Sequence, residues 1–376
     1  MRRTIGIIAA VLLSGSAASA GSSPALWPDK AAVRLLAKAD AAPATVAGPG
    51  NGILRRAALA RLQTAPLDPA ALRWMAMTAS GNEKRRWLQL AETATRRDGL
   101  VQLQLVEEAV LSGDPETALT HLDRAWTVYP ELRARIAPLL LAAIEDEPVR
   151  NALSARIKAG RPWVGALIQT ALGRSDDVEP LARTIIAAGR LGDAERGYIA
   201  PILNTLVAQG QIDTATAFAQ MQLTNGQETV RTAGFSGSTT DPIGAPYTWR
   251  LTNDAEVAST VHGDAGLEVL AEPGISAVIA TRLMPAPTRD LIVRVEYGSS
   301  LSASNLPDEL SLKLDCVASG KVSRSAVLRA EPSAGQRTLQ GRWNNRDCPL
   351  TALSLSLDTL RSSTTAGLVI TQVAIT

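Results

Sequence analysis

The first half of the chain carries apolar residues at helical spacing. From about residue 29 to residue 223 they recur every three or four positions, between short polar or glycine-containing breaks. This spacing places apolar side chains on one face of an α-helix. An acidic residue followed by proline, a typical helix start, occurs at Asp68, Asp114 and Glu147. The pattern predicts roughly a dozen helices joined by short loops, so that successive helices are antiparallel neighbours.

Residues 113–130, GDPETALTHLDRAWTVYP, give the clearest hairpin signal. The order Ala118, Leu122, Ala125 and Pro130 resembles the second helix of a tetratricopeptide repeat, in which small residues let two helices approach closely. The helix before it departs from the family's pattern at most positions, and the hairpin spacing varies. The resemblance implies a degenerate α-solenoid whose concave groove binds a protein partner. A closed helical bundle without a groove is the alternative.

The second half has a different period. After a Gly-, Thr- and Ser-rich stretch, apolar and polar residues alternate, as in Leu310, Leu312, Leu314 and Cys316. Period-two alternation is typical of half-buried strands. About nine or ten short strands follow one another, which indicates an antiparallel β-sandwich. The predicted fold class is therefore multidomain, an N-terminal α-solenoid of helical hairpins followed by an antiparallel β-sandwich.

The sandwich region, residues 235–376, resembles jelly-roll carbohydrate-binding modules. The resemblance rests on an early aromatic strand (GF…PYTWRL), a GLEV strand and a final strand that closes the chain. It implies binding of glycan or protein without catalysis. However, Trp249, Tyr297 and Trp343 lie at core positions of the alternation, whereas sugar platforms need exposed aromatic faces.

A glycan site in the sandwich would then depend on a short stretch near the C-terminus. Its candidate ligand contacts are Trp343, Asn344, Asn345, Arg346 and Asp347. These residues are equally compatible with a hairpin turn, and polysaccharide binding there is a possibility that the sequence leaves open.

The N-terminus has the pattern of a secretory signal peptide. Arg2 and Arg3 precede an apolar run over 5–13, and a small-residue cleavage site ends at Ala20. The run is too short to span a bilayer, although a retained anchor is the alternative. We expect a periplasmic or secreted protein, cleaved after Ala20. The predicted layout is a signal peptide (1–20), a lead-in and linker with one short helix (21–51), the helical repeats (52–223), a linker (224–234) and the sandwich (235–376).

Charge and cysteine content narrow the classes of partner. The chain has 38 basic and 36 acidic residues, and cleavage after Ala20 would remove two arginines and leave a net charge of zero. A neutral chain argues against a nucleic-acid partner, and no later apolar run is long enough to span a membrane. The only cysteines, Cys316 and Cys348, are expected to form a disulfide in an exported protein. Two free buried thiols are the alternative.

No motif indicates catalysis, a cofactor or a metal. Two histidines and two scattered cysteines cannot supply a zinc site. GFSGS lacks the final glycine of a nucleophile elbow, and DCVASGKVS lacks the phosphate-loop spacing. Six arginines of the helical half belong either to a solvated face or to a clamp for carboxylates or sulfates: Arg85, Arg86, Arg96, Arg97, Arg133 and Arg135.

The function favoured by these patterns is non-catalytic binding and scaffolding. The helical repeats would engage a protein partner and the sandwich a glycan or a protein; accessory proteins of envelope or exopolysaccharide assembly offer an architectural analogy. The alternative is a polysaccharide lyase or hydrolase with a helical catalytic domain. Convergence of Tyr129 and Tyr198 with His121 and an arginine in one cleft would favour that enzyme.

Overall fold

The structure is a computed structural model of the 376-residue chain. It describes residues 29–41, 51–223, 235, 245–262, 266–285, 291–300, 302–303, 305–318, 321–332, 338–344 and 348–375. The chain divides into two compact units, Met1–Thr170 and Ala171–Thr376. The predicted signal peptide and its cleavage site at Ala20 lie outside the described residues.

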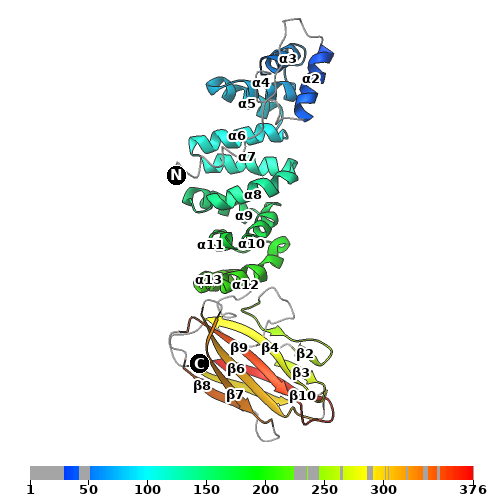
Figure 1. Cartoon of the computed structure of the whole chain (residues 1–376), viewed down its shortest axis with the longest axis vertical. Helices are drawn as coiled ribbons and strands as arrows, with labels where there is room; N and C mark the ends of the chain where they lie inside the picture. The colour runs from blue at the N-terminus through cyan, green and yellow to red at the C-terminus, as the bar shows by residue number, and fades with distance from the viewer. Residues whose placement is uncertain are drawn as a thin grey trace. The chain divides into compact units, whose positions relative to one another are not determined.

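Helices occupy the first half of the described chain (Figure 1). The α-helices are α2 (Asp29–Ala41), α3 (Asn51–Thr64), α4 (Pro69–Thr78), α5 (Gly81–Ala94), α6 (Gly99–Ser112), α7 (Pro115–Val128), α8 (Arg133–Ala143), α9 (Glu147–Lys158), α10 (Val164–Leu172), α11 (Val178–Ala188), α12 (Ile199–Ala208) and α13 (Ile212–Gln222). Short 3-10 turns are η2 (Pro130–Leu132), η3 (Ser175–Asp177) and η4 (Asp193–Tyr198). The prediction of an all-helical first half is confirmed.

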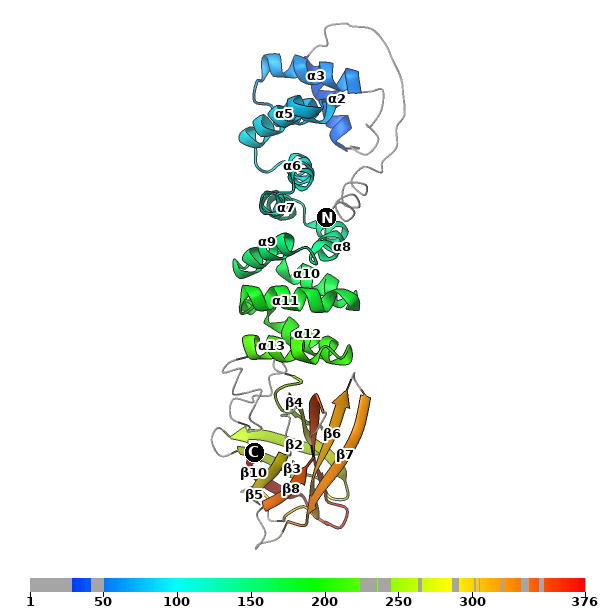
Figure 2. The ribbon, with the colours of Figure 1, turned by 90° about the vertical axis from the view of Figure 1, so that its left-hand side faces the viewer.

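The expected helix signals account for the helix ends. Asp68 and Asp114 cap α4 and α7, each accepting a hydrogen bond from a backbone N–H of the first turn. Gly113 ends α6 with a φ of 74°, in the left-handed conformation that glycine adopts without a steric penalty. The breaks are therefore short, and consecutive helices pack as antiparallel neighbours, α6 on α7 among them (Figures 1 and 2).

Polar side chains connect helices that are not consecutive. Asp98 caps α6 through two backbone N–H groups and also pairs with Arg73 of α4, with both side chains buried. Trp126 and Trp163 meet edge to face at 4.9 Å, and the Trp163 indole donates to Asp123 at 2.7 Å. Trp74, Trp126 and Trp163 are core residues, as the sequence predicts, and Trp87 is half-buried.

The second half forms two antiparallel five-stranded sheets (Figure 2). The strands are β1 (Arg250–Leu251), β2 (Val257–His262), β3 (Gly266–Ala271), β4 (Ser276–Pro285), β5 (Leu291–Ser299), β6 (Glu309–Ala318), β7 (Lys321–Ala330), β8 (Thr338–Trp343), β9 (Leu350–Asp358) and β10 (Ala366–Ile375). The order is β1-β4-β9-β6-β7 in one sheet and β2-β3-β10-β5-β8 in the other. The predicted β-sandwich is confirmed.

The sandwich core follows the alternation seen in the sequence. Leu310, Leu312 and Leu314 of β6 pair in register with Leu357, Leu355 and Leu353 of β9, and all six are buried. These residues belong to a single core cluster that runs from Phe235 to Val373 and includes residues of both sheets. The two sheets therefore share one continuous core.

Two details of the sandwich differ from expectation. Strand β2 is missing from the predicted strands, because its inward face carries Ser259 between two valines and the apolar alternation is weak there. Tyr247 and Trp249 are predicted to share the core face of a strand; both are buried, but residues 246–249 are not a strand. Trp249 packs in the core, whereas the Tyr247 hydroxyl lies 3.2 Å from Thr216 Oγ1 of α13.

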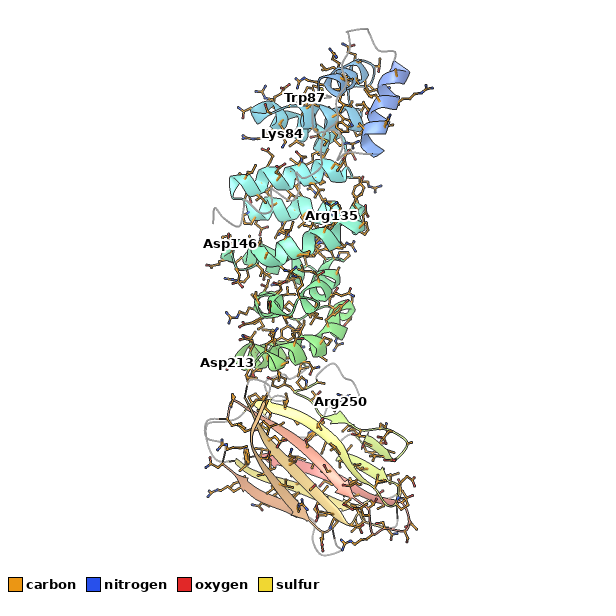
Figure 3. The ribbon with its side chains drawn as sticks, in the orientation of Figure 1. Lys84, Trp87, Arg135, Asp146, Asp213 and Arg250 are labelled. Atoms are coloured by element: carbon orange, nitrogen blue, oxygen red, sulfur yellow. A yellow bond between two sulfur atoms is a disulfide. The ribbon has the colours of Figure 1, made fainter. Side chains whose placement is uncertain are left out.

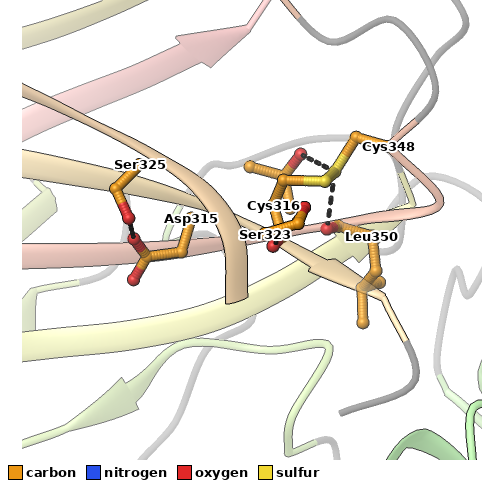
Figure 4. Close-up of a disulfide and its surroundings, with 7 residues drawn as sticks. Asp315, Cys316, Ser323, Ser325, Cys348 and Leu350 are labelled. Carbon is orange, nitrogen blue, oxygen red and sulfur yellow. Dashed lines mark hydrogen bonds between the residues drawn. A yellow bond between two sulfur atoms is a disulfide. The ribbon is translucent and has the colours of Figure 1, made fainter. Parts of the chain in front are cut away.

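The predicted disulfide is confirmed. Cys316 at the end of β6 is bonded to Cys348 in the segment before β9, with a Cα–Cα distance of 5.6 Å (Figure 4). On the outer side of the same strand, Ser325 Oγ of β7 donates to Asp315 Oδ1 at 2.5 Å. The bridge ties the end of a central strand to the turn that leads into its neighbour.

Candidate functional site

A concave, apolar site lies between α6, α7, α8 and α9. The space open to the centre of a water molecule there is about 130 Å³. Its walls are apolar side chains from all four helices, among them Leu103, Val106, Leu122, Ile136, Leu139 and Val149. Small residues, Ala118 of α7 and Ala143 of α8, line the same space and leave room for it. We refer to this feature as the groove.

The groove walls combine buried and accessible surface. Val106, Leu119 and Leu122 are buried and form part of the helix packing, whereas Leu139 and Val149 are only half-buried. An apolar space of this kind is poorly hydrated, because its walls offer water no hydrogen-bond partners. An apolar side chain from another molecule would therefore gain free energy by entering it.

Two aspartates, Asp114 and Asp146, line the groove, and they differ in their hydrogen bonding. Asp114 is engaged within its own helix, where its carboxylate accepts hydrogen bonds from Thr117 N at 3.0 Å and Thr117 Oγ1 at 2.6 Å. The hydrogen bonds from the Thr117 hydroxyl and backbone keep the pKa of Asp114 below its usual value. Asp114 is thus an anion whose main role is to cap α7.

Asp146, which is half-buried, is the aspartate of the groove whose carboxylate is not engaged in a helix cap. It precedes α9, yet it makes no side-chain capping bond, and its carboxylate has no hydrogen-bond or ion-pair partner among the described residues. Glu145 and Glu147 flank it and are exposed. Residues 99–147 hold nine acidic and three basic residues, a net charge of −6. The three consecutive carboxylates at 145–147 favour a cation at the mouth of the groove.

The arginine clamp, one of the two alternatives for the six arginines, is not part of this groove. Arg133 instead donates to the Trp126 carbonyl at 2.9 Å, and Arg85 pairs with Glu108 at 3.4 Å. The remaining four of the six arginines, Arg86, Arg96, Arg97 and Arg135, are exposed. None of the six lines the groove, whose rim is acidic. A surface of this sign favours cations and disfavours carboxylates and sulfates.

His121 is a buried residue between two helices. Its Nδ1 lies 2.7 Å from Gln102 Oε1 of α6 and 3.7 Å from Glu92 Oε1 of α5. Burial lowers the pKa of His121, an effect that Glu92 opposes and Arg124 reinforces. In the described contacts of His121 there is no tyrosine: Tyr129 packs over Gly99, and Tyr198 belongs to the other compact unit. The arrangement that would favour the lyase is therefore not assembled around His121.

The candidate ligand stretch of the sandwich is described only in part. Trp343 is 6% exposed, belongs to the core cluster and lies 5.9 Å from the Arg324 guanidinium carbon, while Asn344 is exposed. Asn345, Arg346 and Asp347 lie outside the described residues. Phe235, Tyr247, Trp249 and Tyr297 are buried as well. All five of the Phe, Tyr and Trp residues after residue 223 are thus unavailable for stacking on a sugar ring.

The described residues offer neither a metal site nor a membrane span. In the part of the chain that the structure describes, no group of three His, Cys, Asp or Glu side chains is arranged to hold a metal ion. Among the described helices, none is both long and apolar enough to cross a bilayer.

Comparisons with known proteins give little similarity. No protein-family model matches the chain, and no curated protein does. Among solved structures, a family 61 carbohydrate-binding module in complex with β-1,4-galactotriose matches 38% of this chain and 94% of its own length. The sequence identity is 10% and the TM-score is 0.28, values at which the similarity supports no statement about function.

Sequence reasoning missed the residues that matter most here. The groove combines residues from four helices, and a single sequence does not specify which side chains share a concave face. Asp146 was visible only as part of an acidic run before Pro148. The uneven charge of the helical half was a usable signal, since residues 51–98 hold nine basic and four acidic residues, a net charge of +5.

Proposed function

We propose that this protein is a non-catalytic binding protein whose groove takes a basic, amphipathic segment of a protein partner. The observation that carries the proposal is the apolar groove with the unengaged carboxylate of Asp146 at its mouth. Helix-in-groove recognition uses apolar anchor side chains that enter such a space. A Lys or Arg next to the anchor would meet Asp146, Glu145 and Glu147.

Charge complementarity selects the partner's chemistry. An acidic segment would place like charges at the mouth of the groove, which costs binding free energy. A purely apolar segment would leave Asp146 without a partner and partly desolvated. A segment that carries both an apolar anchor and a cation can pack the anchor against the apolar walls and pair the cation with Asp146.

Other parts of the proposal go beyond the groove. An exported, periplasmic or secreted location fits the Cys316–Cys348 disulfide, because such bonds persist in oxidising compartments. Glycan binding by the sandwich stays a prediction, and it would have to use polar groups because the aromatic side chains are buried. A role in envelope or exopolysaccharide assembly is likewise a hypothesis from architecture.

A displayed library of random peptides tests the proposal, because the selection itself identifies the chemistry that the groove binds. Selection against the wild-type chain should enrich peptides with an aromatic or aliphatic residue next to Lys or Arg. Their affinity should fall at least about tenfold for Val149→Asp, which puts a charge on the groove wall. Val327→Asp, a matched change at an exposed valine of β7, should leave binding unchanged.

The proposal fails under either of two results. One is the absence of enrichment for apolar and basic residues in peptides that bind the wild type. The other is equal affinity of the selected peptides for wild type and Val149→Asp, when circular dichroism shows that both chains are folded.

A further inference from the structure

Helix α5 presents an exposed apolar residue beside an arginine. Leu90 is 48% exposed, and Arg86 lies one helical turn before it on the same face. Arg86 has no hydrogen-bond or ion-pair partner among the residues the structure describes. Among the other exposed residues on this face, Glu83 is acidic and pairs with Arg55 of α3, while Asn82, Gln89 and Thr93 are uncharged. We call the pair Arg86 and Leu90 the α5 stripe.

Neighbouring side chains of α5 are engaged within the molecule. Lys84 lies 3.5 Å from both Glu107 and Glu108 of α6, and the Trp87 indole donates to Glu83 at 3.3 Å. Figure 3 shows Lys84 and Trp87 on α5, and Asp146 farther along the helical half. The internal contacts of α5 therefore leave the stripe available to another molecule.

The stripe has the chemistry that the groove requires. It offers one apolar anchor and one cation, and the groove offers apolar walls with Asp146 at the mouth. Several charges of the two segments pair within the chain, as Lys84 does with Glu107 and Glu108, whereas Arg86 and Asp146 have opposite charges and no partner among the described residues. This complementarity within one chain favours association between copies.

We infer that the chain self-associates head to tail, with the α5 stripe of one copy docked in the groove of the next. This inference rests on the proposed function, because it uses the same groove. The exposed leucine favours a protein surface over a polyanion as the stripe's partner, since a polyanion would gain nothing from Leu90. The contact joins two different surfaces, so each copy keeps one free stripe or groove and assembly continues beyond a dimer unless a ring closes.

Sedimentation velocity of the full chain over a concentration series, at low and at high salt, tests the inference. The wild type should grow past twice the monomer mass as concentration rises, and less so at high salt, because ions screen the contact. Arg86→Glu, Leu90→Ser and Asp146→Lys should each weaken association at least about tenfold. Arg342→Glu, a charge reversal at an exposed arginine of β8, is the matched control and should have no effect.

A mixing experiment separates a specific contact from loss of folding. Arg86→Glu and Asp146→Lys chains should be monomeric alone, but should associate when mixed, because each supplies the charge that the other has lost. A wild type that stays monomeric at all concentrations in low salt overturns the inference. So does a mixture that fails to associate while each variant is folded.

The same measurements distinguish this inference from the proposed function. If selected peptides bind the groove of a wild type that is strictly monomeric, self-association is overturned while the proposed function stands. If association persists in Val149→Asp, the groove is not the docking site and the inference is overturned whatever the peptides do.

Discussion

The sandwich and the first helices of the molecule differ in how their hydrophobic cores are divided. The sandwich has one core cluster that includes residues of both sheets and a disulfide at its edge. The first helices instead form smaller clusters, one built from α2, α3 and α4 and the next from α4, α5 and α6. The buried pair Arg73–Asp98 joins α4 to the start of α6 within the second of these clusters.

This difference indicates where binding surfaces can form. A single core fills the space between its two layers, and the sandwich keeps its aromatic residues inside. The groove lies in the helical half, between α6, α7, α8 and α9, and stacked helical hairpins commonly present such concave surfaces. Substitutions should accordingly act on one half at a time.

The largest expected effect is the loss of an indole from the helical core. Trp126→Ala removes a fully buried side chain and should lower the free energy of unfolding of the helical half by about 4 kcal/mol. Val128→Ala, an exposed position on the same helix, should change it by less than about 0.5 kcal/mol. Denaturant unfolding followed by far-UV circular dichroism measures both. A shift of the sandwich transition by the same amount would contradict separate cores.

Removal of the disulfide should act on the other half. Cys316→Ala with Cys348→Ala opens a loop with a sequence separation of 32 residues and should cost the sandwich about 3.5 kcal/mol through the entropy of its unfolded state. The helical transition should stay in place. Thermal unfolding with and without reductant gives the same comparison in the wild type. Two alkylatable thiols in the oxidised protein would show that the bond does not form.

Breaking a buried ion pair should have a somewhat smaller effect. Asp98→Ala removes the partner of Arg73 and the cap of α6, and should cost about 3 kcal/mol because a buried cation loses its counter-charge. Asp193→Ala removes an exposed partner of Arg196 and should cost less than about 1 kcal/mol. If chemical denaturation shows the same loss of unfolding free energy for both variants, burial does not determine how much these ion pairs contribute to stability.

The smallest predicted effect is a pH dependence confined to the helices. Burial lowers the pKa of His121 from its ordinary value of 6.5, so the unfolded chain binds this proton more readily than the folded one. Stability contributed by neutral His121 is therefore complete above about pH 6.5 and is lost as the pH falls towards the folded-state pKa. His121→Gln should reduce this slope in urea unfolding between pH 8 and 5. A variant with the wild-type slope would assign the dependence to other groups.

The sequence predicted the elements better than the site. Leucine at every second position fixes the faces of β6 and β9, because a shift by one residue would expose the whole row. Acid–proline pairs marked the starts of α4, α7 and α9, and Gly113 and Gly189 the ends of α6 and α11. Strand β2 was not predicted because a buried serine interrupts the alternation, and the segment of Tyr247 was predicted as a strand although only its burial is as expected.

The groove could not be predicted from the sequence for a different reason. Helical periodicity identifies the buried face of each helix, but it does not show how far apart two helices lie. Ala118 was interpreted as a residue for close packing, and it does line the space, which remains open beside α8 and α9. The acidic rim is present in the sequence as the run Glu145, Asp146 and Glu147 before Pro148, but a short charge run does not by itself indicate a concave site.

Hydrogen exchange with a selected basic, amphipathic peptide tests the central claim most directly, since it compares the two halves in one sample. Bound peptide should slow exchange of backbone amides in α6 to α9, residues 99–158, and leave the sandwich strands unchanged. Protection in the strands with the helices unchanged would contradict the assignment of the binding site to the groove.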